Sequence, residues 1–117
     1  MNSLRNRVLL IGRLGAQPET KTLPSGSPMA RFSLATTETY KNEKGERVSE
    51  TQWHNLVAWG KIAQIAGKIL DKGKEVAVEG KLVTKNYVDK EGVKRYVTEV
   101  VVNDLLLVGS KPQDLKE

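Results

Sequence analysis

Cysteine is absent from the 117 residues of the chain, so the chain can form no disulfide, carry no thiol nucleophile and bind no metal through cysteine. Histidine occurs once, as His54, and no pair of carboxylates stands near it at the spacing of metal ligands. We therefore predict neither a metal site nor a cofactor. For His54 the sequence favours a structural hydrogen bond or a place in a subunit interface.

Long apolar segments are missing as well. The run nearest the N-terminus, Val8–Ile11, is shorter than the core of a signal peptide, and no later run approaches the length that spans a membrane. These absences predict a soluble, unexported protein of the cytoplasm. The length of 117 residues suits one domain with a core of its own.

Motifs of phosphate-binding enzymes and nucleases find little support. Glycine precedes lysine at Gly60, Gly73 and Gly80, but no glycine stands five residues before any of them, which excludes a P-loop. The acidic residues within Tyr40–Glu50 alternate with basic ones, and this favours a solvated hairpin over a metal-dependent nuclease site. We predict that the chain is not an enzyme and has no catalytic residue.

Positive charge, in contrast, is in surplus. The chain has 19 Lys and Arg against 14 Asp and Glu, which gives a formal net charge of +5. Such a surplus favours polyanionic partners, although a soluble protein with a merely basic surface has the same composition.

Apolar residues recur along five short segments, which predicts five strands. These are Val8–Ile11 with Gly12 and Leu14 beyond it, Ala30–Thr37, Thr51–Ala58, Glu75–Tyr87 and Tyr96–Val108. Between the third and the fourth, Lys61–Leu70 shows helical spacing and Gly73 supplies a stop, so we predict one helix there. The charged segment Tyr40–Glu50 predicts an exposed hairpin loop, and Asp89–Gly92 predicts a turn.

This order of elements fits an all-β fold. It predicts a five-stranded Greek-key barrel of the OB-fold type, with one α-helix between the third and fourth strands and a long hairpin joining the last two. An α+β sheet packed on one helix is the structural alternative. We assign residues 1–109 to the barrel domain and residues 110–117 to a short flexible C-terminal end.

Four aromatic residues stand among lysines and arginines on strands or strand ends: Tyr40, Trp53, Trp59 and Tyr87. Rings beside positive charge suit a surface that stacks the bases of single-stranded nucleic acid and attracts its phosphates. Two-residue spacing puts Trp53 and Trp59 on one face. A tryptophan on a strand packs in a core as readily as it contacts a ligand, so the residues alone leave both interpretations of this pair open.

For Tyr87 the pattern favours stacking. Alternation along its strand turns one set of residues inward and another outward. The inward set is Val76, Val78, Gly80 and Leu82, and the outward set is Lys81, Val83, Lys85 and Tyr87. A large ring beside two cations is a poor core residue, which favours a binding role. Tyr96 flanks the adjacent loop, where a ring could cap the barrel or meet a ligand.

In combination these segments closely resemble the family of bacterial and organellar single-stranded-DNA-binding proteins. The matching residues are Asn6, Val8, Leu10, Gly12, Leu14, Pro18 and Glu19, then Phe32–Thr36, Trp53–Val57, Trp59–Lys61, Lys72–Val76, Glu79–Leu82 and Thr98–Val102. The resemblance implies an OB-fold protein that binds and protects single-stranded DNA, with little regard to its sequence, in replication, recombination and repair. It also implies a homotetramer that associates with the nucleoid.

Carried over position by position, the resemblance places the family's base-stacking aromatics on Tyr40, Trp53, Trp59 and Tyr87, which resolves the tryptophan question towards binding. It implies subunit contacts from Asn6, Val8 and His54. The candidate phosphate contacts are Arg5, Arg7, Arg31, Lys41, Lys61, Lys72, Lys74, Lys81, Lys85 and Arg95. Among these, Arg31 and Lys85 rank first because strand periodicity turns both outward.

One segment departs from the family pattern. Members commonly continue into a flexible linker with an acidic, hydrophobic tip that recruits replication and repair enzymes, and Lys111–Glu117 does not match such a tail. Recruitment of those partners through a tail is therefore not expected. Two other functions are compatible with the same features: an OB-fold replication-restart adaptor or RNA-binding module, and a purely structural oligomer. A nuclease is a third alternative, which the missing catalytic constellation disfavours.

Overall fold

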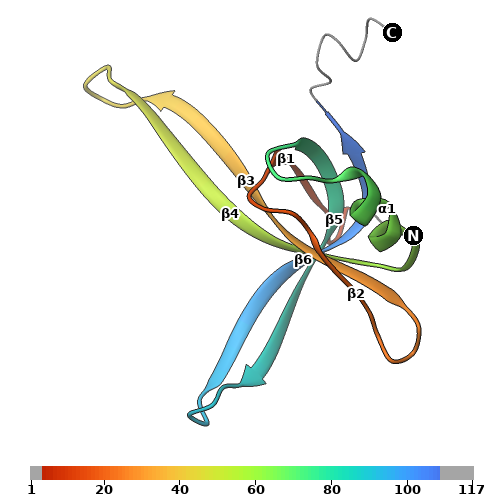
Figure 1. Ribbon diagram of the computed structural model, residues 1–117. Helices are drawn as coiled ribbons and strands as arrows, with labels where there is room; N and C mark the ends of the chain where they lie inside the picture. The colour runs from red at the N-terminus through yellow and green to blue at the C-terminus, as the bar shows by residue number, and fades with distance from the viewer. Residues whose placement is uncertain (1–3, 109–117) are drawn as a thin grey trace, which may run out of the picture.

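The computed structural model describes residues 4–108. Within them the chain forms β1 (Val8–Leu14), β2 (Glu19–Thr22), β3 (Pro28–Lys41), β4 (Arg47–Trp59), α1 (Gly60–Ile69), β5 (Glu75–Val88) and β6 (Lys94–Leu107). Figure 1 shows a small barrel from which two long hairpins, β3–β4 and β5–β6, project in different directions. We call these hairpins the β3–β4 arm and the β5–β6 arm.

The strands form one sheet that closes on itself. Neighbours follow the order β1-β5-β6-β4-β3-β2, and β1 returns to pair with β3, with Arg13 opposite Ala35 and Leu14 opposite Leu34. The strands β1, β3, β4, β5 and β6 therefore make a closed barrel, and α1 lies between β4 and β5 in the chain. This confirms the predicted fold class and excludes the open α+β sheet.

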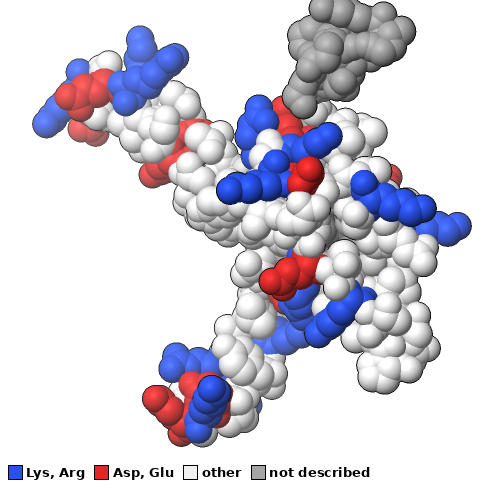
Figure 2. Space-filling model, viewed as in Figure 1, with Lys and Arg blue, Asp and Glu red and all other residues white. Residues whose placement is uncertain are grey.

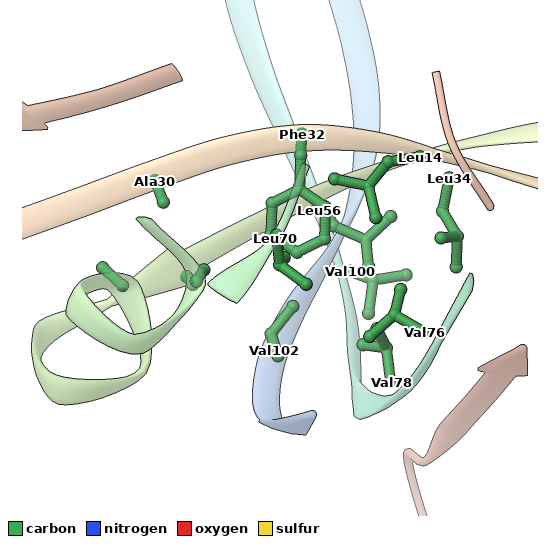
Figure 3. Packing of buried hydrophobic residues seen from close by; sticks show 13 residues of the cluster. Leu14, Ala30, Phe32, Leu34, Leu56, Leu70, Val76, Val78, Val100 and Val102 are labelled. Carbon is green, nitrogen blue, oxygen red and sulfur yellow. The ribbon is translucent and has the colours of Figure 1, made fainter. Parts of the chain in front are cut away.

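The core lies inside the barrel, where the inward side chains of the five barrel strands are apolar (Figure 3). Leu34 of β3, Leu56 of β4 and Val76 of β5 are fully buried, and α1 adds Ala63 to the same cluster. Burial of a side chain the size of leucine or valine stabilises a fold by about 1.5–3 kcal/mol. The predicted strands Ala30–Thr37 and Thr51–Ala58 are thus confirmed as parts of β3 and β4, and the register decides which face of the second is inner.

Two stretches differ from the sequence-based expectation. The strand β2 was not predicted, because all four of its residues are exposed and it therefore shows no apolar alternation. The predicted hairpin loop Tyr40–Glu50 is wrong in extent: β3 continues to Lys41 and β4 begins at Arg47, so only the residues between them form the turn. Polar side chains face each other along this arm, as in the hydroxyl pair of Thr37 and Thr51 at 3.1 Å, and such pairs stabilise a solvated ribbon.

The inward assignment of Leu82 is also wrong, because its side chain is 49% exposed. Val76 and Val78, which precede it on the same strand, are buried as predicted. Leu82 lies where β5 leaves the barrel to form the arm. The side chains of β5 still alternate between the two faces there, but no core covers the face to which Leu82 points. No helix within residues 4–108 is long and apolar enough to cross a membrane, and the predicted C-terminal end, residues 110–117, lies outside the described range.

Closure of the barrel requires a glycine at position 12. A Cβ atom at Gly12 would lie well inside van der Waals distance of the backbone carbonyl oxygen of Ala35, where β1 crosses β3. Backbone cannot yield as a side chain does, so we expect Gly12→Ala to lower the free energy of unfolding by about 1–3 kcal/mol or more. Chemical denaturation monitored by circular dichroism measures this loss.

Gly67→Ala is the matched control for that experiment. A Cβ atom at Gly67 would meet only the Thr20 methyl group, at 3.2 Å, and alanine is favoured over glycine within a helix by about 1 kcal/mol. We expect this variant to keep its stability. Equal stability of Gly12→Ala and the unmodified chain would contradict the close approach.

Candidate nucleic-acid interface

The outer face of the barrel is continuous from β3 across β4 to β6. Cross-strand partners point their side chains to the same side of a sheet, and successive residues alternate between sides. Ser33 is paired with Asn55, so both point away from the core that holds Leu34 and Leu56. The parallel pair of Val57 with Val101 carries this outer face onto β6, where Glu99 also belongs to it.

A groove of about 370 Å³ is hollowed into this face. Its polar lining comes from the segment between β1 and β3 and from three barrel strands: Gln17, Glu19, Arg31, Ser33, Asn55 and Glu99. Charged and neutral side chains that donate or accept hydrogen bonds therefore surround this groove, which suits a polar ligand.

Trp53 stands next to the groove and is 61% exposed. It lies two positions before Asn55 on β4, on the same outer face. Its ring rests against Gly15, because a Cβ atom at that position would come within 2.6 Å of Cζ3 and 2.8 Å of Cη2. Trp53 is thus a surface residue whose ring contacts Gly15, and it is not part of the core. For Trp53, this answers the question of burial that the sequence left open.

The other three predicted aromatics are also exposed, but they are spread over the molecule. Trp59, at the end of β4, is 39% exposed and points to the same side of the strand as Trp53. Tyr87, on the β5–β6 arm, is opposite Arg95 and on the outer side with Lys85, as predicted. Tyr40 is paired with Val48 and therefore points to the other side of the β3–β4 arm from Trp53.

Four of the ten predicted phosphate contacts have acidic partners within the chain. Arg31 Nη1 and Lys85 Nζ both contact the carboxylate of Glu99, the lysine at 3.5 Å from Oε1. The other two pairs are Arg7 with Glu79 at 3.4 Å and Arg95 with Asp89 at 2.9 Å. The pairs of Arg7 and Arg95 are largely exposed and contribute about 0–1 kcal/mol each, so a phosphate can compete for these two cations at small cost. Glu99 is only 5% exposed, so removing either of its two cations leaves a buried charge less well compensated.

The remaining six cations are exposed, and none of them forms an ion pair with an acidic side chain of residues 4–108. They are Arg5, Lys41, Lys61, Lys72, Lys74 and Lys81. Figure 2 shows side chains of both charges at the tips of the two arms, while most of the β3–β4 arm between tip and barrel is uncharged. The visible surface is therefore not a uniformly positive patch.

The tip of the β5–β6 arm is organised by Asp89. Its carboxylate accepts hydrogen bonds from Arg95 Nε and from the backbone amides of Val93 and Glu91, each at 2.9 Å. The Arg95 bond, followed by that of Val93, lowers the pKa of Asp89 below its ordinary value. The charged form is thus favoured in the folded chain, and its contribution to the tip is lost only as the pH falls through that lowered pKa.

The predicted subunit contacts make hydrogen bonds or packing contacts within the chain. The Asn6 side chain donates a hydrogen bond to the carbonyl of Leu82 at 3.0 Å and accepts one from the Leu82 amide at 2.9 Å. These bonds extend the pairing of β1 with β5 beyond the N-terminal end of β1. Val8 packs against the core, and His54 Nε2 shares a hydrogen bond of 2.9 Å with the Thr36 hydroxyl. The structure therefore gives each of them a role in the fold.

The outer sides of β1 and β6 carry apolar side chains that the sequence analysis did not assign to a face. Leu9 is 65% exposed, Ile11 53% and Leu106 68%, and Ala77 of β5 lies between Ile11 and Leu106 in the register. The available signal was that Val8–Ile11 is apolar at every position, which predicts a strand covered on both sides.

Within residues 4–108 no cluster of three or more histidine, aspartate and glutamate side chains has an arrangement that could hold a metal ion. The described part of the chain thus offers exposed rings, exposed cations and a polar groove. These groups suit the binding of a flexible polyanion with planar bases.

Comparison with known proteins agrees with this chemistry. Residues 5–108 match the model of the single-strand binding protein family. The chain belongs to that family. A single-stranded DNA-binding protein of Neisseria meningitidis is 39% identical over 93% of this chain and 63% of its own length. Single-stranded DNA-binding protein 1 of Chlorobaculum tepidum is 44% identical over 91% of this chain and 66% of its own length.

A solved structure is similar over the whole barrel. The Plasmodium falciparum SSB in its complex with single-stranded DNA has a TM-score of 0.80 and 35% identity, covering 93% of this chain and all of that one. The OB-fold is thereby confirmed. Membership of a family of DNA-binding proteins without enzymatic activity also confirms the prediction that the chain is not an enzyme. The chain spans just under two thirds of the length of the Neisseria and Chlorobaculum relatives.

Gly15 is a residue that sequence reasoning missed, and its contact with Trp53 is open to test. In a Trp59→Phe background, where Trp53 is the only tryptophan, we expect Gly15→Ala to displace the ring and change its emission maximum and its quenching by acrylamide. Stability should change by only about 0.5 kcal/mol, because the contact lies on the surface.

Ala16→Ser is the matched control, because Ala16 is exposed and adjacent to Gly15 in the chain. We expect it to leave the Trp53 spectrum unchanged. An unchanged spectrum in Gly15→Ala would show that the ring does not depend on the glycine.

Proposed function

We propose that the chain binds single-stranded DNA with little regard to sequence and protects it during replication, recombination and repair. The observation that carries this proposal is Trp53, which is 61% exposed, rests on Gly15 and stands beside a polar groove. An exposed ring with a fixed position is suited to stack on a base. The relatives' names and the DNA complex of the similar structure support the same conclusion.

Base stacking supplies the part of the binding that does not depend on sequence. We assign it to Tyr40, Trp53, Trp59 and Tyr87, all of which are exposed. Stacking contributes about 1–3 kcal/mol per base, and every base has a planar face to offer. In duplex DNA these faces are covered by neighbouring base pairs, so the same rings favour single strands.

Phosphate contacts supply the rest. The exposed cations without acidic partners in residues 4–108 are available at once, and those in exposed pairs, such as Arg7, become available when a phosphate replaces the carboxylate. Each neutralised phosphate releases counterions, so the affinity decreases as salt increases. We place this activity in the domain of residues 1–109, and the protein in the cytoplasm with the nucleoid.

We further propose that the chain forms a homotetramer. Support comes from the exposed apolar row of Ile11, Ala77 and Leu106, with Leu9 beside it, on the outer side of β1, β5 and β6. Exposed apolar side chains that adjoin across strands are a common mark of a subunit contact. Asn6, Val8 and His54 remain candidates for supporting positions at its edge.

Binding is tested by titration with oligo-dT while tryptophan fluorescence is recorded. We expect quenching, an affinity that falls as salt rises, and a loss of about 1–3 kcal/mol of binding free energy in Trp53→Ala without unfolding. A duplex of the same length should bind far more weakly. Equal affinity for duplex and single strand would overturn the proposal, and competition by oligo-U tests whether RNA is bound as well.

The β5–β6 arm offers a matched pair of variants for the same assay. Tyr87 is 52% exposed and Tyr96 66%, but Tyr96 is paired with Asn86 and points to the opposite side of the arm. We expect Tyr87→Ala to weaken oligo-dT binding by about 1–3 kcal/mol and Tyr96→Ala to leave it nearly unchanged. The reverse order would contradict the assignment of the outer side.

Sedimentation with and without oligo-dT tests the assembly. A tetramer is expected, and Leu106→Glu should reduce its size because it places a charge in the apolar row. Val88→Glu is the control, since Val88 is 67% exposed, close to the 68% of Leu106, but lies at the end of β5 in the arm. A monomer in the unmodified chain would refute the tetramer without affecting the single-strand proposal.

A further inference from the structure

The strand β2 forms a border of the sheet that no other strand of residues 4–108 covers. It pairs with β3 on one side and stands at the end of the strand order, whereas β1, at the other end, returns to pair with β3. All four residues of β2 are exposed, and its hairpin with β3 projects from the barrel separately from the two long arms (Figure 1). A hollow of about 580 Å³ lies between β2 and α1, so the helix leaves room beside the strand. The outer edge of β2 is therefore open to a further strand.

Open edges present backbone N–H and C=O groups that pair readily with other chains, and proteins protect such edges with proline, bulges or charge. The strand β2 contains no proline, and its pairing with β3 is regular from Glu19 opposite Arg31 to Thr22 opposite Pro28. Its protection is limited to the charges of Glu19 and Lys21. These charges repel strands of unmatched charge and admit a strand whose charges are complementary.

Neither charge of β2 has an ion-pair partner among residues 4–108. Glu19 is opposite Arg31 in the register, but Arg31 is bonded to Glu99. Two-residue spacing puts Lys21 on the same face of the sheet as Glu19, which is the outer face that also carries Arg31. A negative and a positive side chain therefore stand side by side along the open edge, each without a partner in this part of the chain.

The charges of β2 are complementary to those of a second β2 in one antiparallel register. When two copies meet with Thr20 opposite the partner's Thr20, Glu19 is opposite the partner's Lys21, and Lys21 is opposite the partner's Glu19. Any other register that keeps the faces matched is shifted in steps of two residues. The nearest shift in one direction puts Glu19 opposite the partner's Glu19, and the nearest shift in the other puts Lys21 opposite the partner's Lys21. The charges therefore select the register centred on Thr20.

We propose that β2 pairs with β2 of a second copy of the chain, and that this contact joins neighbouring assemblies on one strand of DNA. The inference rests on the proposed binding of single-stranded DNA and adds a contact between the bound copies. The two-fold axis of such a pair is perpendicular to the sheet, so the outer faces of both copies, each with its Trp53, lie on the same side. A DNA strand that leaves one outer face can therefore continue onto the next.

The small size of the contact decides when it forms. A pair of four-residue strands is much smaller than the interfaces of about 1,200–2,000 Å² that hold stable complexes together. Assemblies free in solution should therefore not associate through β2. Two assemblies on the same DNA strand are held close together, which raises their effective concentration enough for a weak contact to form. The apolar row of Ile11, Ala77 and Leu106 lies on β1, β5 and β6, so the β2 contact leaves the proposed tetramer contact free.

The test compares two lengths of oligo-dT, one that holds a single assembly and one that holds two, as determined by sedimentation. With the unmodified chain we expect the second assembly to bind the long oligonucleotide about tenfold more tightly than the first, because two opposite-charge pairs and the strand pairing add to its binding. The short oligonucleotide measures the affinity of one assembly for DNA in the same buffer.

Glu19→Lys separates the contact between copies from the general attraction to DNA. The variant adds positive charge, so a single assembly should bind the short oligonucleotide at least as tightly as the unmodified chain does. It also sets lysine opposite lysine in the β2 pair, so the second assembly should lose its tenfold advantage. Lys21→Glu sets glutamate opposite glutamate and should lose the advantage too, with weaker binding of the short oligonucleotide.

The double variant Glu19→Lys/Lys21→Glu is the matched control. It has the net charge of the unmodified chain and again sets opposite charges against each other, so the advantage of the second assembly should return. Both residues are exposed, and circular dichroism should show that all three variants fold.

The outcomes distinguish this inference from the proposed function. Independent binding of two assemblies by the unmodified chain, an advantage that persists in Glu19→Lys, or one that does not return in the double variant would each overturn the β2 contact while single-strand binding stands. If the short oligonucleotide were not bound, the proposed function would fail and the contact with it. Loss of the advantage in both single variants and its return in the double variant would support the inference.

Discussion

The pairing of β3 with β4 runs from Met29 opposite Trp59 to Lys41 opposite Arg47 without a bulge, and most of the outer face depends on it. Because side chains alternate strictly along both strands, the choice of inner residues also fixes the outer ones. Leu34 and Leu56 point into the core, so Ser33 and Asn55 must point outward. A slip of one residue would bury Trp53 and expose leucine, which makes the position of the ring a consequence of core packing.

The second constraint is the irregularity in the pairing of β5 with β6. Glu79 is opposite Asp104 but Gly80 is opposite Val102, so β6 has one extra residue at this point and its alternation is reversed. Leu105 and Leu107 pack against the core on one side of the bulge, and Val100 and Val102 do so on the other. The bulge thus allows both Glu99 and Leu106, which lie on opposite sides of it in the same strand, to point outward.

These two constraints explain how much of the molecule the sequence could predict. Where pairing is regular, as along Ala30–Thr37 and Thr51–Ala58, a two-residue period identified both strands and the residues that share a face, whereas the exposure of Trp53 became clear only with the register. The residues on both sides of the bulge are apolar at successive positions, Val100–Val102 and Leu105–Leu107, so alternation could not assign the outward positions of Glu99 and Leu106. Glu99 also lacked an obvious signal, since its partners Arg31 and Lys85 are 68 and 14 residues away in the chain.

Gly15 illustrates a different limit. Its importance comes from the ring of a residue far along the chain, and only the folded structure brings Trp53 against it. Likewise, Arg31 and Lys85 share Glu99 as their acidic partner only because the fold brings together the outer faces of three strands. Residue types predicted the chemistry of the surface, whereas its geometry required the register.

The separation of the two arms bears on the kind of nucleic acid that the proposed function can accept. Trp53 lies where the β3–β4 hairpin joins the barrel and Tyr87 on the β5–β6 arm, and the two hairpins project in different directions (Figure 1). A duplex has a persistence length of about 50 nm, and bending it over the distance between two arms of one small domain costs several kcal/mol. A single strand bends freely and exposes each base separately. The divergence of the arms therefore selects for single strands by shape, in addition to the selection by stacking.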